Sequence, residues 1–331
     1  MKILVTGAGG FLGSRLAAAL LAGAPGVPEV ATLVAVDTTV GSIDDPRVQW
    51  RTGTIADDRF TRSVVEDGVD LVYHLAAVVS GQAEAEFDLG MRVNVDATRA
   101  LLDACRRLEK PPRFVFSSSL AVFGGPLPAV VPEDASVVPQ SSYGSEKAIA
   151  ELLVHEYSRK RFVDGIVCRL PTVAIRPGAP NAAASSFVSG IVREPLSGID
   201  TVCPVPLDTP LWIASPGTVI ANLVHAARVP TSDLEPRRTV NFPGLSVTPA
   251  QMLNSLEREA GPAVRARVRL SLDERIAKIV CSWPGMFDVS RALHLGFSAD
   301  RDIDGIIRQF MAGRGHERRS QMWRPGTQGG A

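Results

Sequence analysis

Residues 2–13, Lys-Ile-Leu-Val-Thr-Gly-Ala-Gly-Gly-Phe-Leu-Gly, join a short apolar run to a glycine-rich turn. The run at 2–6 is typical of a buried strand, and residues 15–21 after the turn are typical of a helix. Glycines at 7, 10 and 13 allow a tight turn, close approach of the backbone to a pyrophosphate, and close packing of helix on strand. The stretch therefore predicts a dinucleotide site, formed by Gly7, Gly10, Phe11, Leu12 and Gly13.

Asp37 ends the next predicted strand, residues 32–36, roughly 20 residues past the glycines. A carboxylate at this position can accept hydrogen bonds from both hydroxyls of an adenosine ribose, and it would repel a 2′-phosphate. The sequence therefore favours NAD over NADP. A solvated loop aspartate is the plain alternative for Asp37, and Arg15 and Arg47 keep NADP open as a second cofactor.

Strand and helix patterns alternate through the first half of the chain. Strands are predicted at residues 48–51, 71–75, 113–116 and 165–170, with helices at 58–66 and 86–109 between them. This order is typical of an α/β protein with a Rossmann-type, doubly wound parallel sheet. We expect residues 1–170 to form a cofactor domain, 171–312 mainly a smaller α/β substrate-binding domain, and 313–331 a flexible tail.

Small or polar residues follow two of these strands, at the sheet edge where parallel sheets bind ligands. Ala76 and Ala77 follow the strand at 71–75, and small side chains there let a cofactor approach the backbone. Three serines, 117–119, follow the strand at 113–116 and bring hydroxyls to the same edge. Asn94, inside the predicted 86–109 helix, fixes backbone or water near the site, or it is an ordinary packing amide.

Tyr143 and Lys147 are four residues apart in a stretch with a helical apolar rhythm, so they share one helix face. An ammonium group beside a phenol favours the phenolate and lowers the tyrosine pKa from about 10, which makes Tyr143 a candidate acid/base at neutral pH. By itself this spacing is weak, because many helices carry such a pair on their surface. The serines at 117–119 complete a proton-handling set.

The bulk composition excludes several classes of function. The 331 residues are 45% hydrophobic and 21% charged, with a formal net charge of zero, which argues against a broad nucleic-acid or membrane-surface footprint. The four cysteines and five histidines are scattered without metal-ligand spacing. We therefore predict buried thiols in a reducing cytoplasm, no metal site, no evident signal peptide and no membrane span.

The second half of the chain has a weaker pattern. Residues 126–140 are proline-rich and predict a flap before the Tyr143 helix. A helix is predicted at 182–193, and its start, with Asn181 and Ser185, forms either half of a substrate pocket or an ordinary capped helix. Further helices are predicted at 216–228, 249–260, 272–279, 289–295 and 302–311, with short strands near Val202 and Val240.

The chain resembles an extended short-chain dehydrogenase/reductase over about residues 1–312. The resemblance rests on the order of the glycine loop, Asp37, Ala76-Ala77, Asn94, Ser119, Tyr143 and Lys147. It implies that Ser119 is the catalytic hydroxyl, with Ser118 as second choice, and that Tyr143 is the acid/base. It also implies that Lys147 binds the nicotinamide ribose. By the same resemblance, the cofactor would contact Thr54, Ile55, Leu75, Asn94, Tyr143 and Pro171.

One departure from that family bears on the substrate. Members that act on nucleotide sugars usually carry an Arg-Asp pair at the start of a strand in the second domain, where the arginine holds the diphosphate. The equivalent stretch here is Thr-Pro-Leu-Trp-Ile at 209–213, which lacks that charge partner. Residues 169–187, Arg193-Glu194-Pro195-Leu196 and Ser-Trp-Pro-Gly at 282–285 instead resemble the D-erythronate dehydrogenase branch, whose members oxidise a four-carbon sugar acid at C2 with NAD.

For such a substrate, we expect the C2 hydroxyl to lie between Ser119 and Tyr143. Tyr143 would take its proton while C2 gives hydride to the nicotinamide, and Lys147 with a water relay through Asn94 would return the proton to solvent. The carboxylate needs donors, and the candidates are the backbone N–H groups at the start of the 182–193 helix, Ser185, Ser80 and Arg176.

Two other functions stay open. A nucleotide-sugar epimerase or dehydratase of the same family is the first, and a non-catalytic NAD-sensing protein is the second. The full set of Ser119, Tyr143 and Lys147 argues against the latter, because a binding protein does not need it. The resemblance also implies a homodimer formed through the helices that carry Asn94 and Tyr143.

Overall fold

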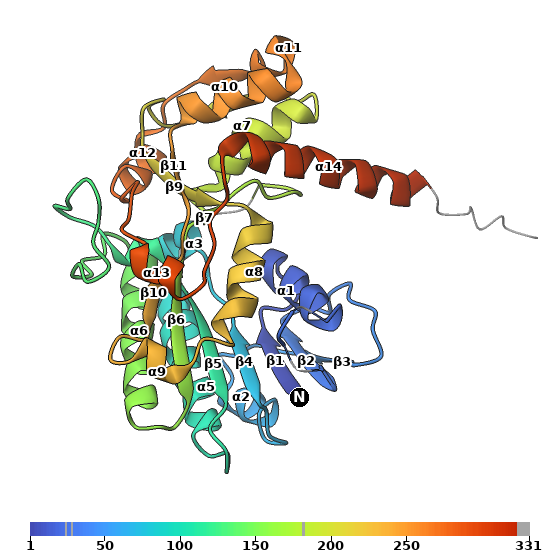
Figure 1. Ribbon diagram of the computed structural model, residues 1–331, viewed down its shortest axis with the longest axis vertical. Helices are drawn as coiled ribbons and strands as arrows, with labels where there is room; N and C mark the ends of the chain where they lie inside the picture. The colour runs from blue at the N-terminus through green and yellow to red at the C-terminus, as the bar shows by residue number, and fades with distance from the viewer. Residues whose placement is uncertain (24, 28, 181–182, 323–331) are drawn as a thin grey trace, which may run out of the picture.

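A seven-stranded, wholly parallel sheet forms the base of the protein in a computed structural model that describes residues 1–23, 25–27, 29–180 and 183–322 (Figure 1). The strand order is β10-β6-β5-β4-β1-β2-β3, and every neighbouring pair runs parallel. The strands are β1 (Lys2–Thr6), β2 (Thr32–Asp37), β3 (Val48–Thr52), β4 (Leu71–His74), β5 (Arg113–Ser119), β6 (Asp164–Leu170) and β10 (Thr239–Asn241). The predicted Rossmann-type α/β fold is confirmed.

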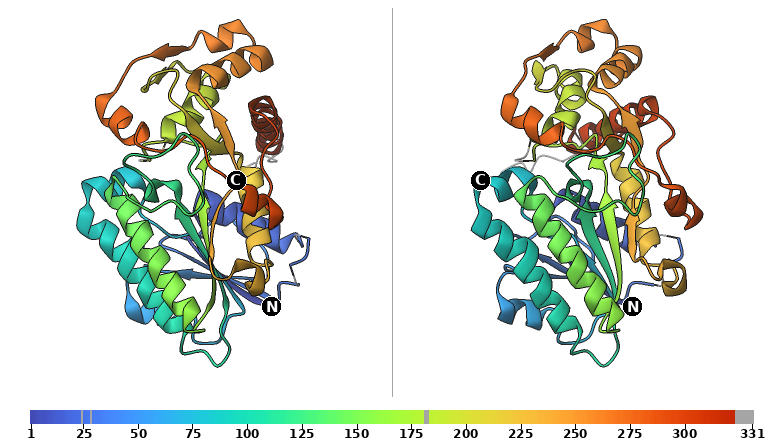
Figure 2. Two further views of the ribbon diagram at one scale, coloured as in Figure 1. Left: turned by 60° about the vertical axis from the view of Figure 1, so that its left-hand side comes forward. Right: turned by 90° about the vertical axis from the view of Figure 1, so that its left-hand side faces the viewer.

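Helices cover both faces of this sheet (Figure 2). On one face α1 (Phe11–Leu21) packs beside α8 (Pro216–Ala226), and their apolar residues share a core cluster with β1 and β4. On the other face lie α2 (Asp58–Ser63), α5 (Ala97–Cys105) and α6 (Ser142–Arg159), over a second cluster. Apart from the edge strand β3, the strands are mostly buried, which explains why they appear in the sequence as nearly continuous apolar runs.

The strand order reverses between β1 and β4, because the chain leaves β1 towards β2 and β3 and then crosses back. At such a switch point the loops after neighbouring strands diverge and leave a crevice at the carboxyl ends of the strands. The ends of β1, β4 and β5 therefore converge there: the glycine turn follows β1, Ala76-Ala77 follow β4, and the serines at 117–119, predicted to follow the strand, are the last three residues of β5.

The helix predicted at residues 86–109 is not one α-helix. It begins as α4 (Phe87–Gly90), continues as a π-helical turn (Met91–Asp96), and ends as α5 at Cys105. A short helix, α3 (Ser80–Ala85), precedes it. Asn94 lies in the π-helical turn, and π-turns inside α-helices often mark functional sites.

The second domain lies above the carboxyl ends of the strands (Figure 1). It holds a three-stranded sheet in the order β11-β9-β7 and a two-stranded parallel pair, β12-β8, around a third core cluster. Its strands are β7 (Thr172–Val173), β8 (Thr201–Cys203), β9 (Leu211–Ala214), β11 (Leu245–Val247) and β12 (Val268–Leu270). Its helices are α7 (Ser186–Leu196), α10 (Pro249–Ala260), α11 (Pro262–Arg265), α12 (Glu274–Val280) and α14 (Ile303–Met322).

Three sequence-based boundaries differ from the structure. The first domain does not end at residue 170, because α8 and β10 return to its sheet, with α9 (Thr231–Leu234) and α13 (Ser290–His294) close by. Helix α7 begins at Ser186 rather than 182. Helix α14 continues to Met322, so residues 313–322 are helical, and the flexibility of the tail stays a prediction. The remainder of the predicted tail lies outside the described residues.

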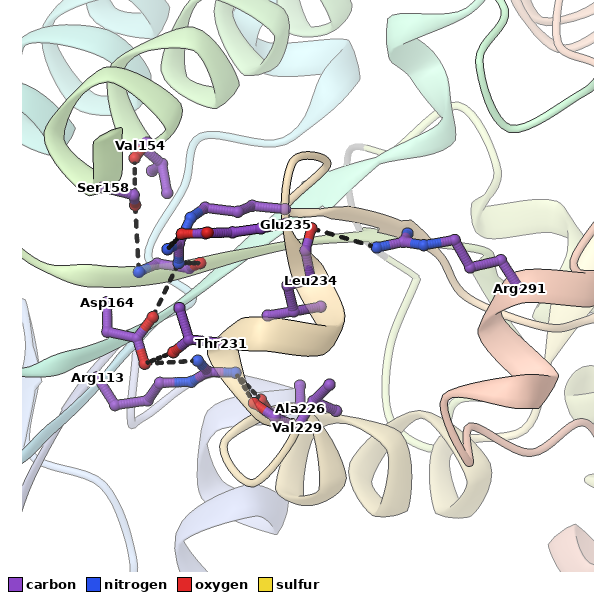
Figure 3. Close-up of polar contacts among 12 residues, drawn as sticks. Arg113, Val154, Ser158, Asp164, Ala226, Val229, Thr231, Leu234, Glu235 and Arg291 are labelled. Carbon is purple, nitrogen blue, oxygen red and sulfur yellow. Dashed lines mark hydrogen bonds and ion pairs between the residues drawn. The ribbon is translucent and has the colours of Figure 1, made fainter. Parts of the chain in front are cut away.

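A cluster of ion pairs joins the returning segment to the sheet (Figure 3). Asp164, at the start of β6, accepts hydrogen bonds from Arg113 (2.8 Å) and Arg238 (2.8 Å). Arg113 also donates to the carbonyl oxygens of Ala226 and Val229, at 2.7 and 3.0 Å, and so closes the carboxyl end of α8. Residues distant in the sequence are thereby held at one end of the sheet.

The sequence led to predictions about membrane spans, metal sites and thiols, and the described part of the chain bears on each of them. None of its helices combines the length and apolar character that a membrane span requires. Its His, Cys, Asp and Glu side chains form no group of three that could hold a metal ion. Cys105, Cys168 and Cys203 are buried free thiols, as predicted, whereas Cys281 is an exposed one.

Candidate active site

The glycine turn after β1 forms the floor of a long cavity. Gly7 has φ of +72°, and a side chain at Gly13 would place its Cβ 2.0 Å from the carbonyl oxygen of Gly7, so neither position accepts another residue without a shift. Asp37 accepts a hydrogen bond from the Gly9 N–H at 2.9 Å, which holds its carboxylate over the turn. The arrangement leaves open backbone at the start of α1, where a pyrophosphate would bind.

This cavity has a volume of about 760 Å³ and matches the predicted cofactor site. An extended dinucleotide needs such a cradle: a glycine-rich floor, a carboxylate at the ribose end and small side chains beside β4, so the residues present fit NAD. The predicted residues that line it are Gly7, Gly10, Phe11, Leu12, Gly13, Asp37, Thr54, Ile55, Leu75, Ala76 and Ala77. Pro171, Tyr143 and Lys147 line an adjoining cavity.

The first turn of α6 carries Tyr143. Ser141 caps the helix, and its hydroxyl oxygen accepts a hydrogen bond from the Gly144 N–H at 3.2 Å. Glu84 on α3 accepts a second one from the Ser142 N–H at 2.9 Å. One turn later Lys147 is almost wholly buried, and its Nζ donates to the carbonyl oxygen of Ser117 at 2.9 Å. The side chains of Tyr143 and Lys147 therefore meet the end of β5.

The predicted lowering of the Tyr143 pKa is wrong for the protein without cofactor. Burial, aided by the negative charge of Glu146, raises the pKa of Tyr143 to about 12, and only the hydrogen bond with Ser119 opposes this. Lys147 Nζ lies 5.7 Å from the centre of the tyrosine ring, because its ammonium group is drawn towards the Ser117 carbonyl. Burial lowers the pKa of Lys147 itself to about 8, although Glu146 and Glu151 raise it.

The three serines that end β5 have different partners. Ser117 donates from its hydroxyl to the carbonyl oxygen of His74 at 3.0 Å. Ser118 donates to the buried carboxylate of Glu151 at 2.5 Å, so its hydroxyl is held by a structural group. Ser119 accepts from the Ala121 N–H at 3.1 Å and bonds with Tyr143, which leaves it beside the acid/base. This geometry favours Ser119 over Ser118 as the reactive hydroxyl.

Asn94 is buried beneath the site and lines neither cavity. Its amide exchanges two hydrogen bonds with the backbone of Val78, at 2.9 and 3.0 Å, and donates a third to Glu146 at 2.6 Å. Both amide hydrogens are therefore used, and a relay through water would have to use an oxygen of Asn94. Its visible role is to fix the loop after β4, and the relay stays a prediction.

The second cavity, about 240 Å³, lies between the two domains and shares Leu12, Leu75, Ala77 and Arg176 with the first. The predicted substrate residues that line it are Ser80, Ser118, Ser119, Tyr143, Arg176 and Ser185. Ser80 also bonds across the domains, because its hydroxyl oxygen accepts from the Ala184 N–H at 3.3 Å. Asn181 lies outside the described residues.

The apolar part of the lining of this cavity was not predicted from the sequence. It is formed by Pro210 and Trp212 at β9 and by Trp283 and Pro284 after α12. The sequence did single out both stretches, as the place of a missing arginine and as a Ser-Trp-Pro-Gly motif, but nothing local indicated that they face the same cavity.

Known proteins resemble this chain over most of its length. The model of the NAD dependent epimerase/dehydratase family matches residues 3–226. A D-erythronate dehydrogenase from Cupriavidus necator is 51% identical over 322 residues, covering 95% of this chain and 99% of the relative. A D-erythronate dehydrogenase from Haemophilus influenzae is 46% identical over 311 residues, covering 94% of this chain and 99% of the relative.

Solved structures have the same fold. One described as a nucleoside-diphosphate-sugar epimerase from Agrobacterium tumefaciens superposes with a TM-score of 0.88 at 40% identity, covering 93% of this chain and 92% of that chain. A GalE-like L-threonine dehydrogenase from Cupriavidus necator superposes with a TM-score of 0.84 at 25% identity, covering 95% and 99%.

These findings confirm the resemblance seen in the sequence, including its likeness to D-erythronate dehydrogenases, and they confirm NAD as the cofactor. The family match extends over more than half of the chain, and both D-erythronate dehydrogenases align along nearly their whole length. The chain belongs to the NAD-dependent epimerase/dehydratase family.

Proposed function

We propose that the protein oxidises the C2 hydroxyl of D-erythronate, or of a closely related small sugar acid, to the 2-oxo acid with NAD. The observation that carries this proposal is the similarity to two D-erythronate dehydrogenases along nearly the whole of each protein, second domain included.

The size and lining of the second cavity support a small substrate. Drug-sized ligands occupy pockets of roughly 300–1,000 Å³, whereas this cavity measures about 240 Å³ and borders the cofactor cavity. At the start of β9, where a nucleotide-sugar enzyme would place its diphosphate arginine, the wall is formed by Pro210, Leu211 and Trp212. An apolar wall cannot compensate a diphosphate charge.

In the proposed reaction the C2 hydroxyl lies between Ser119 and Tyr143, and Tyr143 takes its proton. NAD, when bound, would supply the hydride acceptor and a positive charge. Because burial raises the pKa of Tyr143 to about 12 and only the hydrogen bond with Ser119 opposes this, formation of the phenolate would need further positive charge, and the predicted tuning by Lys147, whose Nζ lies 5.7 Å from the ring centre, belongs to the proposal. Lys147, with its pKa lowered to about 8 by burial, can pass a proton on near neutral pH.

The substrate carboxylate has three candidate partners that line the cavity. Ser80 and Ser185 offer hydroxyl donors, and Arg176 offers positive charge at the junction of the two cavities. We assign the carboxylate to this group as a whole, because Ser80 comes from the cofactor domain and the other two come from the second domain. The acid would then bridge the domains.

The test is NADH formation, followed by absorbance at neutral and alkaline pH. The purified protein receives NAD with D-erythronate, other four- and five-carbon aldonic acids, or UDP-glucose and UDP-galactose. NADH formation with a four-carbon acid supports the proposal. Silence with all acids, together with conversion of a UDP sugar without net NADH, would refute it.

A nucleotide-sugar epimerase or dehydratase is the second candidate. It is favoured by the solved structure described as a nucleoside-diphosphate-sugar epimerase, which is 40% identical to this chain. An enzyme of this kind regenerates its cofactor in each turnover. It would therefore retain NAD through gel filtration and be stabilised by a UDP sugar, and neither behaviour is expected of a dehydrogenase that releases NADH.

We further propose a cytoplasmic homodimer. The buried free thiols Cys105, Cys168 and Cys203 suit a reducing compartment. On the outer face of α6, Leu152 is 69% exposed and Ile149 is 39% exposed, which is apolar area that a second copy could cover. Light scattering should give twice the chain mass, and Leu152→Asp should reduce it to the mass of one chain.

A further inference from the structure

Residues 280–288, which we call the wall segment, contribute to the apolar wall of the second cavity. The wall segment begins at Val280, the last residue of α12, and Val280, Trp283 and Pro284 line the same cavity as Ser119 and Tyr143. Trp212 on β9 also lines it. The lining therefore combines hydroxyls and positive charge with indole and proline carbon.

The wall segment is fastened to the second domain. A side chain at Gly285 would place its Cβ 2.3 Å from the Cβ of Pro210, so the backbone lies directly against that proline. The thiol of Cys281 lies 3.8 Å from the hydroxyl oxygen of Thr209. Between these two contacts the Trp283 N–H donates to the Val280 carbonyl oxygen at 3.1 Å, which closes a turn.

The wall segment is also fastened to the cofactor domain. Val131 donates its N–H to the Met286 carbonyl oxygen at 3.0 Å, and its own carbonyl accepts from the Asp288 N–H at 2.9 Å. Between them Phe287 packs on Phe123 and Trp212, with ring centres 5.4 and 5.6 Å apart. The loop at 126–140, predicted as a flap, is thus paired with the wall segment, and a substrate would meet both as one packed unit.

We propose that Trp283, with Pro284, limits the length of the sugar acid that the enzyme accepts. The proposal rests on the proposed function. Once the C2 hydroxyl lies at Ser119 and Tyr143 and the carboxylate lies among the polar residues, further carbons have to extend towards the wall. An extra CHOH group there would meet the indole and bury a hydroxyl without a partner, which is unfavourable in both shape and hydration. Because the wall is fastened on both sides, it cannot withdraw easily.

The test compares kcat/KM for four-, five- and six-carbon aldonic acids in the wild type, Trp283→Ala and Trp283→Leu. Met286→Ala is the matched control, because Met286 belongs to the same segment but its side chain is 42% exposed. Removing the indole should shift the preference between five- and four-carbon acids by roughly 10-fold or more towards the longer acid, the range set by single groups in apolar pockets. The control should keep the wild-type preference, and the KM for NAD should not change in any variant.

An unchanged ratio in a folded Trp283→Leu variant, checked by circular dichroism, would overturn the proposal. So would an equal shift of the ratio in Met286→Ala, because the effect would then not come from the cavity wall. Failure of the proposed function gives a different result: the wild type itself would then form no NADH with any of the acids.

Discussion

Glu151 on α6, the helix that carries Tyr143 and Lys147, forms a buried ion pair with Arg169 on β6, and the loss of this pair should be among the costliest single changes in the protein. Arg169 donates to Glu151 from Nε at 2.9 Å and from Nη2 at 2.6 Å, while Ser118 donates to the same carboxylate. The two charged side chains are only 5% and 8% exposed. In Glu151→Gln the guanidinium group stays buried without its counter-charge.

Removing one partner of such a pair destabilises a protein by about 3–5 kcal/mol, because the remaining charge is not solvated. That is a large part of a total stability of about 5–15 kcal/mol. Replacing both residues by apolar ones, as in Glu151→Leu with Arg169→Met, should restore much of the loss, since no buried charge then remains. The double variant should therefore be more stable than either single variant.

The assay is urea denaturation followed by circular dichroism. Glu156→Gln is the control, because Glu156 pairs with Arg159 on the same helix, but these side chains are 50% and 67% exposed. We expect that control to change stability very little. If Glu151→Gln lowered the midpoint no more than Glu156→Gln does, the account of a buried, charge-dependent pair would be refuted.

Three further predictions concern the reaction, the cofactor and acid stability. Tyr143→Phe should lower kcat by about 10²–10⁴-fold without lowering the melting temperature. Wild-type turnover should rise with pH, because burial raises the pKa of Tyr143. Near-normal turnover in the variant would exclude Tyr143 as the base. Asp37→Ser should raise the KM for NAD by roughly 10-fold, because a charged acceptor worth about 1.5–3 kcal/mol is lost. It should lower the KM for NADP, measured in parallel, because the repulsion of a 2′-phosphate is relieved. An unchanged ratio of the two KM values would assign cofactor choice to other residues. Burial alone would raise the pKa of Asp164, but the charge of Arg113 and hydrogen bonds from Arg238, Thr231 and Arg113 outweigh it and lower the pKa, so the stabilisation is present above about pH 4 and is lost as the pH falls through the folded-state pKa. The melting temperature of Asp164→Asn should therefore be lower than that of the wild type at neutral pH and should converge with it in acid. Parallel curves of melting temperature against pH would contradict this.

The parallel sheet could be predicted from the sequence because most of its strands are buried. Residues 3–5 and 114–116 are then uninterrupted apolar runs, and the glycine turn identifies which strand comes first. Strand β10 could not be assigned to that sheet, because it pairs with β6 through a contact about 70 residues away in the sequence. Its short Thr-Val-Asn stretch carries no local mark of its partner.

The active site likewise has features that the local sequence indicates and features that arise only from packing. Ser119, Tyr143 and Lys147 were recognisable because their order and spacing are local, whereas the raised pKa of Tyr143 follows from burial that only the packed protein creates. Asn94, in the π-helical turn, forms hydrogen bonds with Val78 and Glu146, which come from two other parts of the chain. The apolar wall likewise arises where residues 209–212 meet residues 280–285.

The central claim, that C2 of a small sugar acid is the reacting carbon, is tested most directly by isotope transfer. The enzyme would be incubated with NAD and D-erythronate carrying deuterium at C2, and in parallel with D-erythronate carrying deuterium at C3. The isotope content of the NADH formed would be measured by mass spectrometry. The account predicts one deuterium in the NADH from the C2-labelled acid and none from the C3-labelled acid. Transfer from C3, or unlabelled NADH from the C2-labelled acid, would contradict it.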